Sequence, residues 1–148
     1  MRPVPVRDAE PADVGAIAML IRALADYEDM ADEAVLSEAD LARWLFGEAP
    51  AAHVTITTTA GGVVAGIALW WVTFSSFAGR PGIWLEDLFV MPEHRGQGHG
   101  RALLDALRRR TDARIEWSVL DWNKPSIRFY ERLGARPVSG WARYRWTP

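Results

Sequence analysis

A glycine-rich stretch past the middle of the chain has the residue types of an anion-binding turn. It reads Arg95-Gly96-Gln97-Gly98-His99-Gly100-Arg101, after an apolar run at residues 83–90 and before leucines at helical spacing. A glycine-rich turn between a strand and a helix aims unpaired backbone N–H groups at an anion. The glycines let a ligand approach the backbone closely, and the two arginines add positive charge. We therefore predict a pyrophosphate cradle at residues 95–101.

Two common phosphate-binding motifs do not fit this stretch. A Walker loop ends in Gly-Lys-Ser or Gly-Lys-Thr, which the chain lacks, and a dinucleotide fingerprint needs GxGxxG where this turn has GxGxG. That fingerprint usually opens a doubly wound domain, whereas this turn lies past the middle of the chain. At this point a glycine-rich turn without any ligand remains an alternative.

The elements that would position this turn form a mixed pattern of helices and strands. We expect strands at residues 4–7, 53–59, 63–73, 83–90, 114–120 and 143–146, and a loop at residues 74–81. We expect helices from Pro11 to about residue 27, from Ser37 to Gly47, after the glycine turn, and from Pro125 to Leu133. This order predicts one α/β domain over residues 1–148, with a mixed sheet flanked by about four helices.

Composition excludes several classes of function. The net charge of −2 gives no global field that favours nucleic acid or an anionic membrane, so neither partner is expected. Without cysteines there can be no disulfide, no thiolate metal site and no cysteine nucleophile, and the three histidines 53, 94 and 99 lack metal-ligand spacing. No apolar run approaches the length of a membrane span, and the N-terminal residues do not read as a signal peptide. We expect a cytoplasmic protein without a metal ion.

Four blocks of sequence resemble one enzyme family in order and spacing. They are LAxYExM from Leu24, LEDLFVM from Leu85, RGxGxG from Arg95 and VLDWNxPSxxFYxxxGA from Val119. Together with the order of elements, they resemble the GCN5-related N-acetyltransferase (GNAT) superfamily along nearly the whole chain. Within it, the blocks are similar to the branch of diamine (spermidine/spermine) N1-acetyltransferases and thialysine acetyltransferases. The resemblance implies the GNAT fold, with a mostly antiparallel central sheet.

The resemblance implies acetyl-CoA as the acetyl donor. The glycine turn would hold its pyrophosphate, the backbone of residues 88–90 would pair with the pantetheine arm, and the start of the last helix would add side-chain hydrogen bonds. The implied cofactor-binding residues are Leu88, Phe89, Val90, Arg95, Gly96, Gln97, Gly98, His99, Gly100, Arg101, Asn123, Pro125, Ser126 and Tyr130.

Acetyl transfer to an amine needs a base and an acid. An alkylammonium must lose a proton before it attacks, and Glu86 is the candidate base, acting directly or through water. An acidic residue in an apolar strand is costly unless it is solvated or paired, so a structural ion pair is the alternative for Glu86. Tyr130 is the candidate acid for the departing thiolate, because a phenol is protonated near neutrality. Its alternative is a core aromatic residue with a satisfied hydroxyl.

The acceptor would occupy an acidic and aromatic pocket. Its expected lining is Tyr27, Glu28, Glu86, Asp87 and Glu116, whose carboxylates and aromatic face attract an ammonium group. Alternation places Glu86 and Asp87 on opposite faces of their strand unless a bulge intervenes. For Tyr27 and Glu28, an ordinary helix end is the alternative.

Two departures from the diamine enzymes bear on the acceptor. Phe74-Ser75-Ser76-Phe77 replaces an acidic residue followed by tryptophan, and the segment between Gly134 and Trp141 is shorter and lacks a carboxylate. The serine-containing loop and Val119–Asn123 resemble the thialysine branch more closely, so we expect a small primary amine rather than spermine.

The predicted function is direct N-acetylation of a small amine in a ternary complex with acetyl-CoA. An acetyltransferase for a protein lysine or N-terminal amine is an alternative, and a CoA-binding sensor without activity is a weaker one. The resemblance also implies a homodimer. The sequence does not name the acceptor, its pathway or its regulation.

Overall fold

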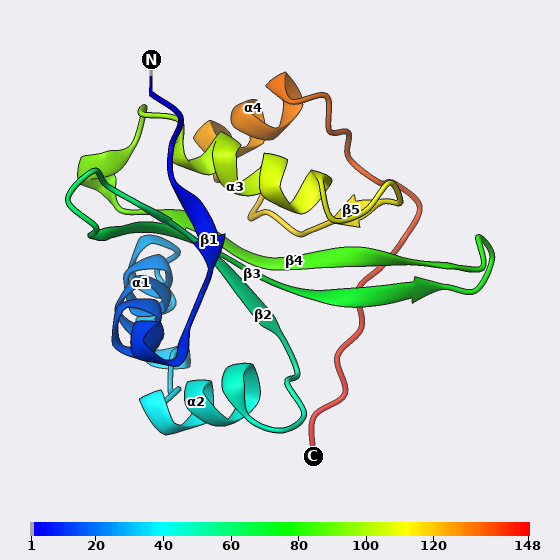
Figure 1. Ribbon diagram of the computed structural model, residues 1–148. Coiled ribbons are helices and arrows are strands. Elements are labelled where there is room, and N and C mark those ends of the chain that lie inside the picture. The colour runs from blue at the N-terminus through cyan, green and yellow to red at the C-terminus, as the bar shows by residue number, and fades with distance from the viewer. Residues whose placement is uncertain (1) are drawn as a thin grey trace. The chain divides into compact units, whose positions relative to one another are not determined.

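The computed structural model describes residues 2–148, and the chain divides at Ser118 into two units. The first unit, which ends at Trp117, contains the sheet and three of the four helices (Figure 1). The second unit, Ser118–Pro148, contains the last helix. Among the described residues, no helix is long and apolar enough to cross a bilayer.

The sheet has five strands in sequence order. They are β1 (Val6–Asp8), β2 (His53–Thr58), β3 (Val64–Ser75), β4 (Arg80–Val90) and β5 (Ile115–Glu116). The strands from β1 to β4 pair antiparallel, and β5 pairs parallel with β4 at only two residues, Ile83 and Trp84. This confirms the predicted α/β fold with a mixed, mostly antiparallel sheet.

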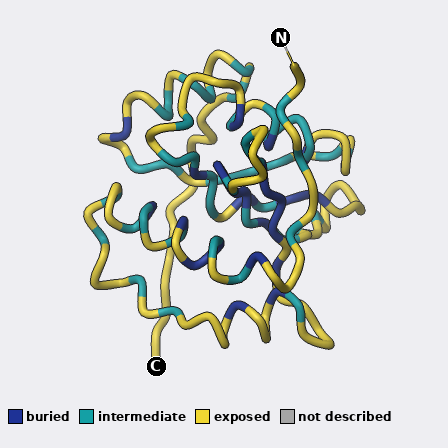
Figure 2. Tube along the Cα trace, turned by 60° about the vertical axis from the view of Figure 1, so that its left-hand side comes forward, coloured by how far each residue is buried: buried dark blue, intermediate teal, exposed yellow. Residues whose placement is uncertain are grey.

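Helices of the first unit cover both faces of the sheet. They are α1 (Val14–Tyr27), which follows a 3-10 turn at Pro11–Asp13, then α2 (Glu38–Phe46) and α3 (His99–Arg108). One core cluster joins α1 and α2 to Val54, Ile56 and Ile67, and a second joins Leu103 and Leu107 of α3 to β3 and β4. Figure 2 shows the buried stretches gathered along the middle strands and on the inward sides of these helices. The strands between the two clusters are therefore apolar on both faces, as continuous apolar runs predict.

Local signals in the sequence explain where the helices begin. Ser37 accepts a hydrogen bond from the Asp40 backbone N–H at 3.1 Å, while Asp40 accepts one from the Ser37 N–H at 2.9 Å. This capping box satisfies two donors that α2 would otherwise leave unpaired. At the start of α1, buried Asp13 takes two hydrogen bonds from the Arg7 guanidinium of β1, at 2.8 and 3.0 Å. The pKa of Asp13 is held below its usual range, chiefly by the hydrogen bonds from Arg7.

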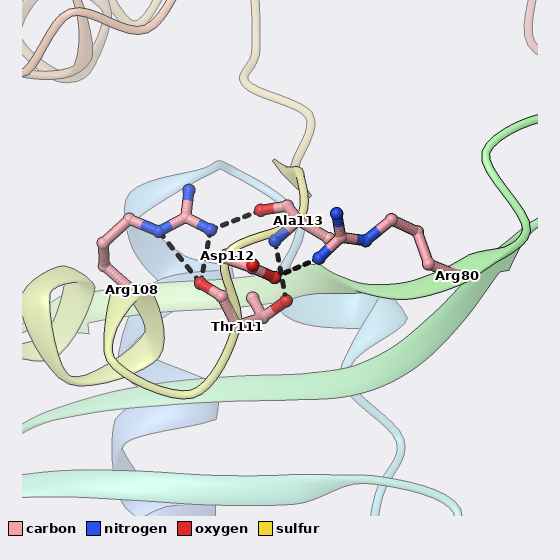
Figure 3. A network of polar contacts seen from close by, with 5 residues as sticks. All are labelled: Arg80, Arg108, Thr111, Asp112 and Ala113. Carbon is pink, nitrogen blue, oxygen red and sulfur yellow. Dashed lines mark hydrogen bonds and ion pairs between the residues drawn. The ribbon is translucent and has the colours of Figure 1, made fainter.

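A polar network holds the turn that leads from α3 into β5 (Figure 3). Arg108, the last residue of α3, donates to the Thr111 carbonyl oxygen at 2.6 and 3.2 Å and also to the Ala113 carbonyl. Arg80, at the start of β4, forms an ion pair with Asp112. A cation at a helix C-terminus also interacts favourably with the helix dipole. The network thus sets where β5 meets β4.

Three predicted elements differ from the observed ones. Residues 74–81 are not a loop, because β3 continues to Ser75 and β4 begins at Arg80, leaving a tight turn at residues 76–79. The strand predicted at residues 114–120 shrinks to the two residues of β5. The last strand predicted at residues 143–146 is wrong, since no strand forms there. Alternating Arg143, Tyr144, Arg145 and Trp146 have the period of a strand but no neighbouring strand to pair with within their unit.

The second unit is built around α4 (Lys124–Arg132). Asn123 is its N-cap and accepts a hydrogen bond from the Ser126 backbone N–H at 3.4 Å, while Pro125 occupies the first turn. Gly134 ends the helix in the left-handed region at φ 94°. Residues 135–148 form no helix or strand, and Trp141, Tyr144 and Trp146 are exposed.

Candidate functional site

A β-bulge in β4 determines where the acidic pair points. The register runs from Leu69 opposite Asp87 directly to Trp70 opposite Leu85, so Glu86 is the extra residue without a partner on β3. Leu85 and Leu88 both pack against the α3 cluster although they are three residues apart. The two residues between them therefore share the opposite side of the strand, which faces α1 and α2. The bulge resolves the conflict that alternation predicted for Glu86 and Asp87.

Three carboxylates influence one another at this bulge. Burial raises the pKa of Asp87 to about 7, with further contributions from the charges of Glu86 and Glu28. Burial also raises the pKa of Glu28, again with a contribution from Glu86. Glu86 itself is exposed and accepts a hydrogen bond from the Trp84 indole N–H at 2.8 Å. The structure thus places Glu28, Glu86 and Asp87 near enough for their charges to influence one another.

Tyr27 and Glu28 lie at the end of α1, where a defined hydrogen-bond pattern terminates the helix. The Met30 backbone N–H donates to the Ala25 carbonyl at 2.8 Å, and the Asp29 N–H donates to the Asp26 carbonyl at 3.1 Å. This is the Schellman pattern, with Asp29 in the left-handed region at φ 59°. Aspartate tolerates this region better than most residues other than glycine. Helix α1 therefore ends beside β4 without a glycine.

The glycine turn has the backbone of an anion cradle. Gly96 and Gly98 lie at φ 75° and φ 91°, which is the left-handed region. A Cβ added at Gly96 would meet nothing within 4 Å, so the turn is open on that side. Gly98 is the N-cap of α3, and no side chain caps the helix. The first backbone N–H groups of α3 are thus available to an anion, and these residues fit the diphosphate of a CoA.

The charged and polar side chains of the turn point to partners within the first unit. Arg95 donates from Nε to the Val90 carbonyl at 2.9 Å, and Arg101 forms an i,i+4 ion pair with Asp105 at 2.9 Å. Gln97 donates to the Glu93 carbonyl at 3.3 Å. An anion at this turn would therefore meet mainly backbone groups.

His99, the first residue of α3, is 5% exposed, and its Nδ1 has no hydrogen-bond partner among the described residues. Burial lowers the pKa of His99, and the nearby His94 lowers it further. The lowered pKa favours the neutral imidazole, which carries no charge toward a phosphate but keeps one N–H donor.

The strand edge next to the turn is available for a ligand. Beyond Trp84, β4 pairs only with β3, and no described strand covers its other edge at residues 85–90. Leu88, Phe89 and Val90 lie in this stretch, as the pantetheine prediction requires. An unpaired strand edge offers a row of backbone hydrogen-bonding groups to an amide-containing ligand.

The remaining predicted site residues belong to the second unit. Asn123 is buried at the start of α4, and Tyr130 lies seven residues later, about two helical turns on and on nearly the same side. The Tyr130 ring packs against Phe129 with centroids 5.4 Å apart. Pro125 and Ser126 form the first turn between them.

Two observations refine the predicted acceptor residues. Glu116 pairs with Arg114 at 2.9 Å and lies opposite Trp84, and it is not among the charges that raise the pKa of Asp87. Trp84, which the sequence analysis missed, holds Glu86 by its hydrogen bond. The sequence could have indicated Trp84, because it lies two residues before Glu86 in the same strand and residues at that spacing share a face. Among residues 2–148, no three His, Asp or Glu side chains are grouped so that they could hold a metal ion.

Comparison with known proteins gives consistent similarities over nearly the whole chain. The model of the acetyltransferase (GNAT) family matches residues 18–135, which spans both units. A thialysine N-epsilon-acetyltransferase of Sus scrofa is 34% identical, with 98% of this chain and 93% of that protein covered. An L-ornithine N5-acetyltransferase of Arabidopsis thaliana is 28% identical, with 96% and 83% covered. The structure of an integron cassette protein from V. cholerae has a TM-score of 0.80 at 24% identity, covering 100% of this chain and 94% of that one.

The raised pKa of Asp87 predicts how stability depends on pH. In the folded protein Asp87 keeps its proton up to about pH 7, whereas the unfolded chain loses it near its ordinary pKa of 3.8. Stability from this group is therefore full below about pH 4 and is lost as the pH rises through 7. Asp87→Asn mimics the protonated acid and does not titrate. From pH 5 to pH 8, the difference in free energy of unfolding between Asp87→Asn and the wild type should therefore grow by at least about 1 kcal/mol in favour of the variant.

Urea denaturation of both proteins at pH 5 and pH 8 measures this difference. Asp121→Asn, which changes an exposed side chain of the second unit, controls for the loss of a carboxylate. If the stability difference between Asp87→Asn and the wild type is the same at both pH values, the pKa of Asp87 is not raised.

Proposed function

Since this chain belongs to the acetyltransferase (GNAT) family and is an acetyl-CoA-dependent N-acetyltransferase, we propose that its acceptor is the primary amine of a small molecule. The acceptor class comprises thialysine, diamines and lysine-like amino acids. The similar proteins of Sus scrofa and Arabidopsis thaliana are named for thialysine and L-ornithine, both of which carry a side-chain amine beside an amino-acid end. These names support the proposal at 34% and 28% identity.

The observation that carries this proposal is the group formed by Glu28, Glu86 and Asp87. Burial and mutual repulsion raise the pKa of Asp87 to about 7, so the site holds its carboxylates at an energetic disadvantage. A bound ammonium group relieves that repulsion, whereas a neutral or anionic acceptor does not. Tyr27, about a third exposed and directly before Glu28, adds an aromatic face.

Acetyl-CoA supplies the acetyl group as a thioester, and the amine attacks its carbonyl carbon directly in the ternary complex, without an acyl-enzyme intermediate. Glu86 accepts the proton of the ammonium group, directly or through water, while its hydrogen bond from Trp84 fixes the carboxylate. Asp87 and Glu28 attract the acceptor's charge. Tyr130 donates a proton to the departing thiolate.

The backbone of the first unit holds the donor. The open N-terminus of α3 and Gly96 to Gly98 bind the diphosphate, and the unpaired edge of β4 at residues 88–90 binds the pantetheine amides. Asn123 and Ser126, at the start of α4, add hydrogen bonds to the same arm.

A cytoplasmic location stays a prediction.

We also propose that the protein works as a homodimer. Apolar side chains are exposed on the part of the β3–β4 hairpin that extends beyond β2 (Figure 1): Val72 is 59% exposed, Phe74 70% and Phe77 fully. A second copy carries the same surface, so a two-fold axis covers both hairpins at once.

The acceptor class is tested by CoA release from acetyl-CoA with a panel of thialysine, L-ornithine, lysine, spermidine, putrescine and aminoglycosides. At least one small amine should turn over. With that amine, Tyr130→Phe should lower kcat by about 100-fold, with CoA affinity unchanged by calorimetry. An unchanged kcat would remove Tyr130 from the acid role. If CoA binds tightly but no amine turns over, the remaining alternatives are an acetyltransferase with a protein acceptor and a CoA-binding sensor.

The cradle is tested at a glycine whose Cβ would meet no protein atom. Gly96→Ala should weaken CoA binding about five- to thirtyfold, because alanine resists the left-handed conformation of the turn by about 1–2 kcal/mol. Gly62→Ala is the matched control, since Gly62 has φ 84° and also nothing within 4 Å, but lies in the β2–β3 turn. Isothermal titration with CoA should give the control the wild-type Kd. Equal Kd values for both variants would contradict the cradle.

The dimer is tested by sedimentation velocity at micromolar concentration. The wild type should sediment as a dimer, and Phe74→Glu should shift it to a monomer, because a charge in an apolar contact is costly to desolvate. Val35→Glu changes an apolar residue that is 86% exposed in the segment between α1 and α2, and it should stay dimeric. A monomeric wild type would show that the proposal is wrong.

A further inference from the structure

The Arg95 guanidinium lies against two aromatic rings. Its guanidinium carbon is 5.2 Å from the centroid of the Tyr27 ring and 5.3 Å from that of Phe89. Its Nε donates to the Val90 carbonyl at 2.9 Å. The two rings are themselves 6.5 Å apart and tilted by 51°. One side chain therefore contacts the end of α1 and the end of β4 together.

This placement connects the two halves of the reaction. The backbone of Arg95 leads directly into Gly96, the first residue of the cradle in the left-handed region. Its side chain rests on Tyr27, which precedes Glu28 at the end of α1. Glu28 in turn is close enough to Asp87 to raise its pKa. Ring contact, chain adjacency and charge interaction thus link the glycine turn to the carboxylates Glu28 and Asp87 within the first unit.

We propose that Arg95 is a positioning residue that couples acetyl-CoA binding to the shape of the acceptor site. When the turn closes on the diphosphate, Arg95 fixes Tyr27 and Glu28 against β4. The inference rests on the proposed function, because it takes the cradle and the acceptor site from it. It differs from a phosphate-binding role, in which the guanidinium would act as a charge on the donor.

The geometry requires arginine rather than any cation. A guanidinium is planar, stacks on aromatic faces and keeps an Nε–H for the Val90 carbonyl, whereas an ammonium is a compact, strongly hydrated charge. Lysine at position 95 would retain the charge near a phosphate but lose the shared contact with both rings. The two roles therefore predict opposite results for the conservative substitution.

Kinetics with thialysine at saturating acetyl-CoA separate the two roles. Arg95→Lys and Arg95→Ala should both raise the KM for thialysine about fivefold, with the Kd for CoA unchanged by calorimetry. Tyr27→Leu should raise the KM at least as much, and the effects of the two substitutions in the double variant should be less than additive, because both remove the contact between Arg95 and Tyr27. Arg43→Ala, which removes a guanidinium 4.5 Å from the Trp44 centroid on α2, should match the wild type.

A phosphate-binding role is the result that would overturn the coupling. In that case Arg95→Ala would weaken CoA binding, Arg95→Lys would restore most of it, and the KM for thialysine would not change.

Hydrogen exchange tests the coupling without any acceptor. CoA should slow exchange of the backbone amides at residues 96–101 and at residues 24–30 in the wild type. In Arg95→Ala, protection at residues 96–101 should persist while that at residues 24–30 is lost. Protection confined to residues 96–101 in the wild type would contradict the coupling alone. CoA that protects neither segment would contradict the cradle as well, and with it the proposed function.

Discussion

The bulge at Glu86 is the constraint on which the candidate site depends. A middle strand covered by helices on both faces must be apolar throughout, so it has no natural place for adjacent carboxylates. Inserting one unpaired residue keeps Leu85 and Leu88 in the α3 core and turns Glu86 and Asp87 together toward α1. The same insertion leaves the rest of β4 in register with β3, so the strand can still lead into the glycine turn.

The donor end of the site depends on groups that the fold leaves unsatisfied. Helix α2 has a capping box, whereas α3 begins at Gly98 without a side-chain cap. A helix start that lacks a cap is costly unless water or a ligand accepts its N–H groups. Together with the edge of β4 at residues 85–90, which pairs with no described strand, this helix start suits a ligand with a diphosphate and amides.

Sequence patterns predicted the elements whose signals are local and missed those that depend on distant pairing. Ser37 with Asp40 and the glycines at 96 and 98 identify helix starts and turns by their own chemistry. The strand predicted at residues 143–146 failed because alternation reports only a strand's faces and not whether a neighbour pairs with it. Likewise, the sequence grouped Glu28, Glu86 and Asp87 through a family resemblance, but the bulge and the role of Trp84 needed the register between strands. The position of Arg95 in the motif predicts a contact with phosphate, and only the structure reveals its two aromatic neighbours.

The raised pKa of Asp87 limits the repulsion among the three carboxylates of the site. With a pKa of about 7, Asp87 is partly protonated near neutrality, so three close carboxylates need not all be charged at once. An arriving ammonium group favours the charged form and lowers the pKa of Asp87, which then releases its proton and becomes a hydrogen-bond acceptor. The attraction between the ammonium group and the Asp87 carboxylate supplies the free energy needed for that ionisation. A neutral ligand of the same shape offers no such attraction, so under the proposed function this half-buried carboxyl favours a charged acceptor.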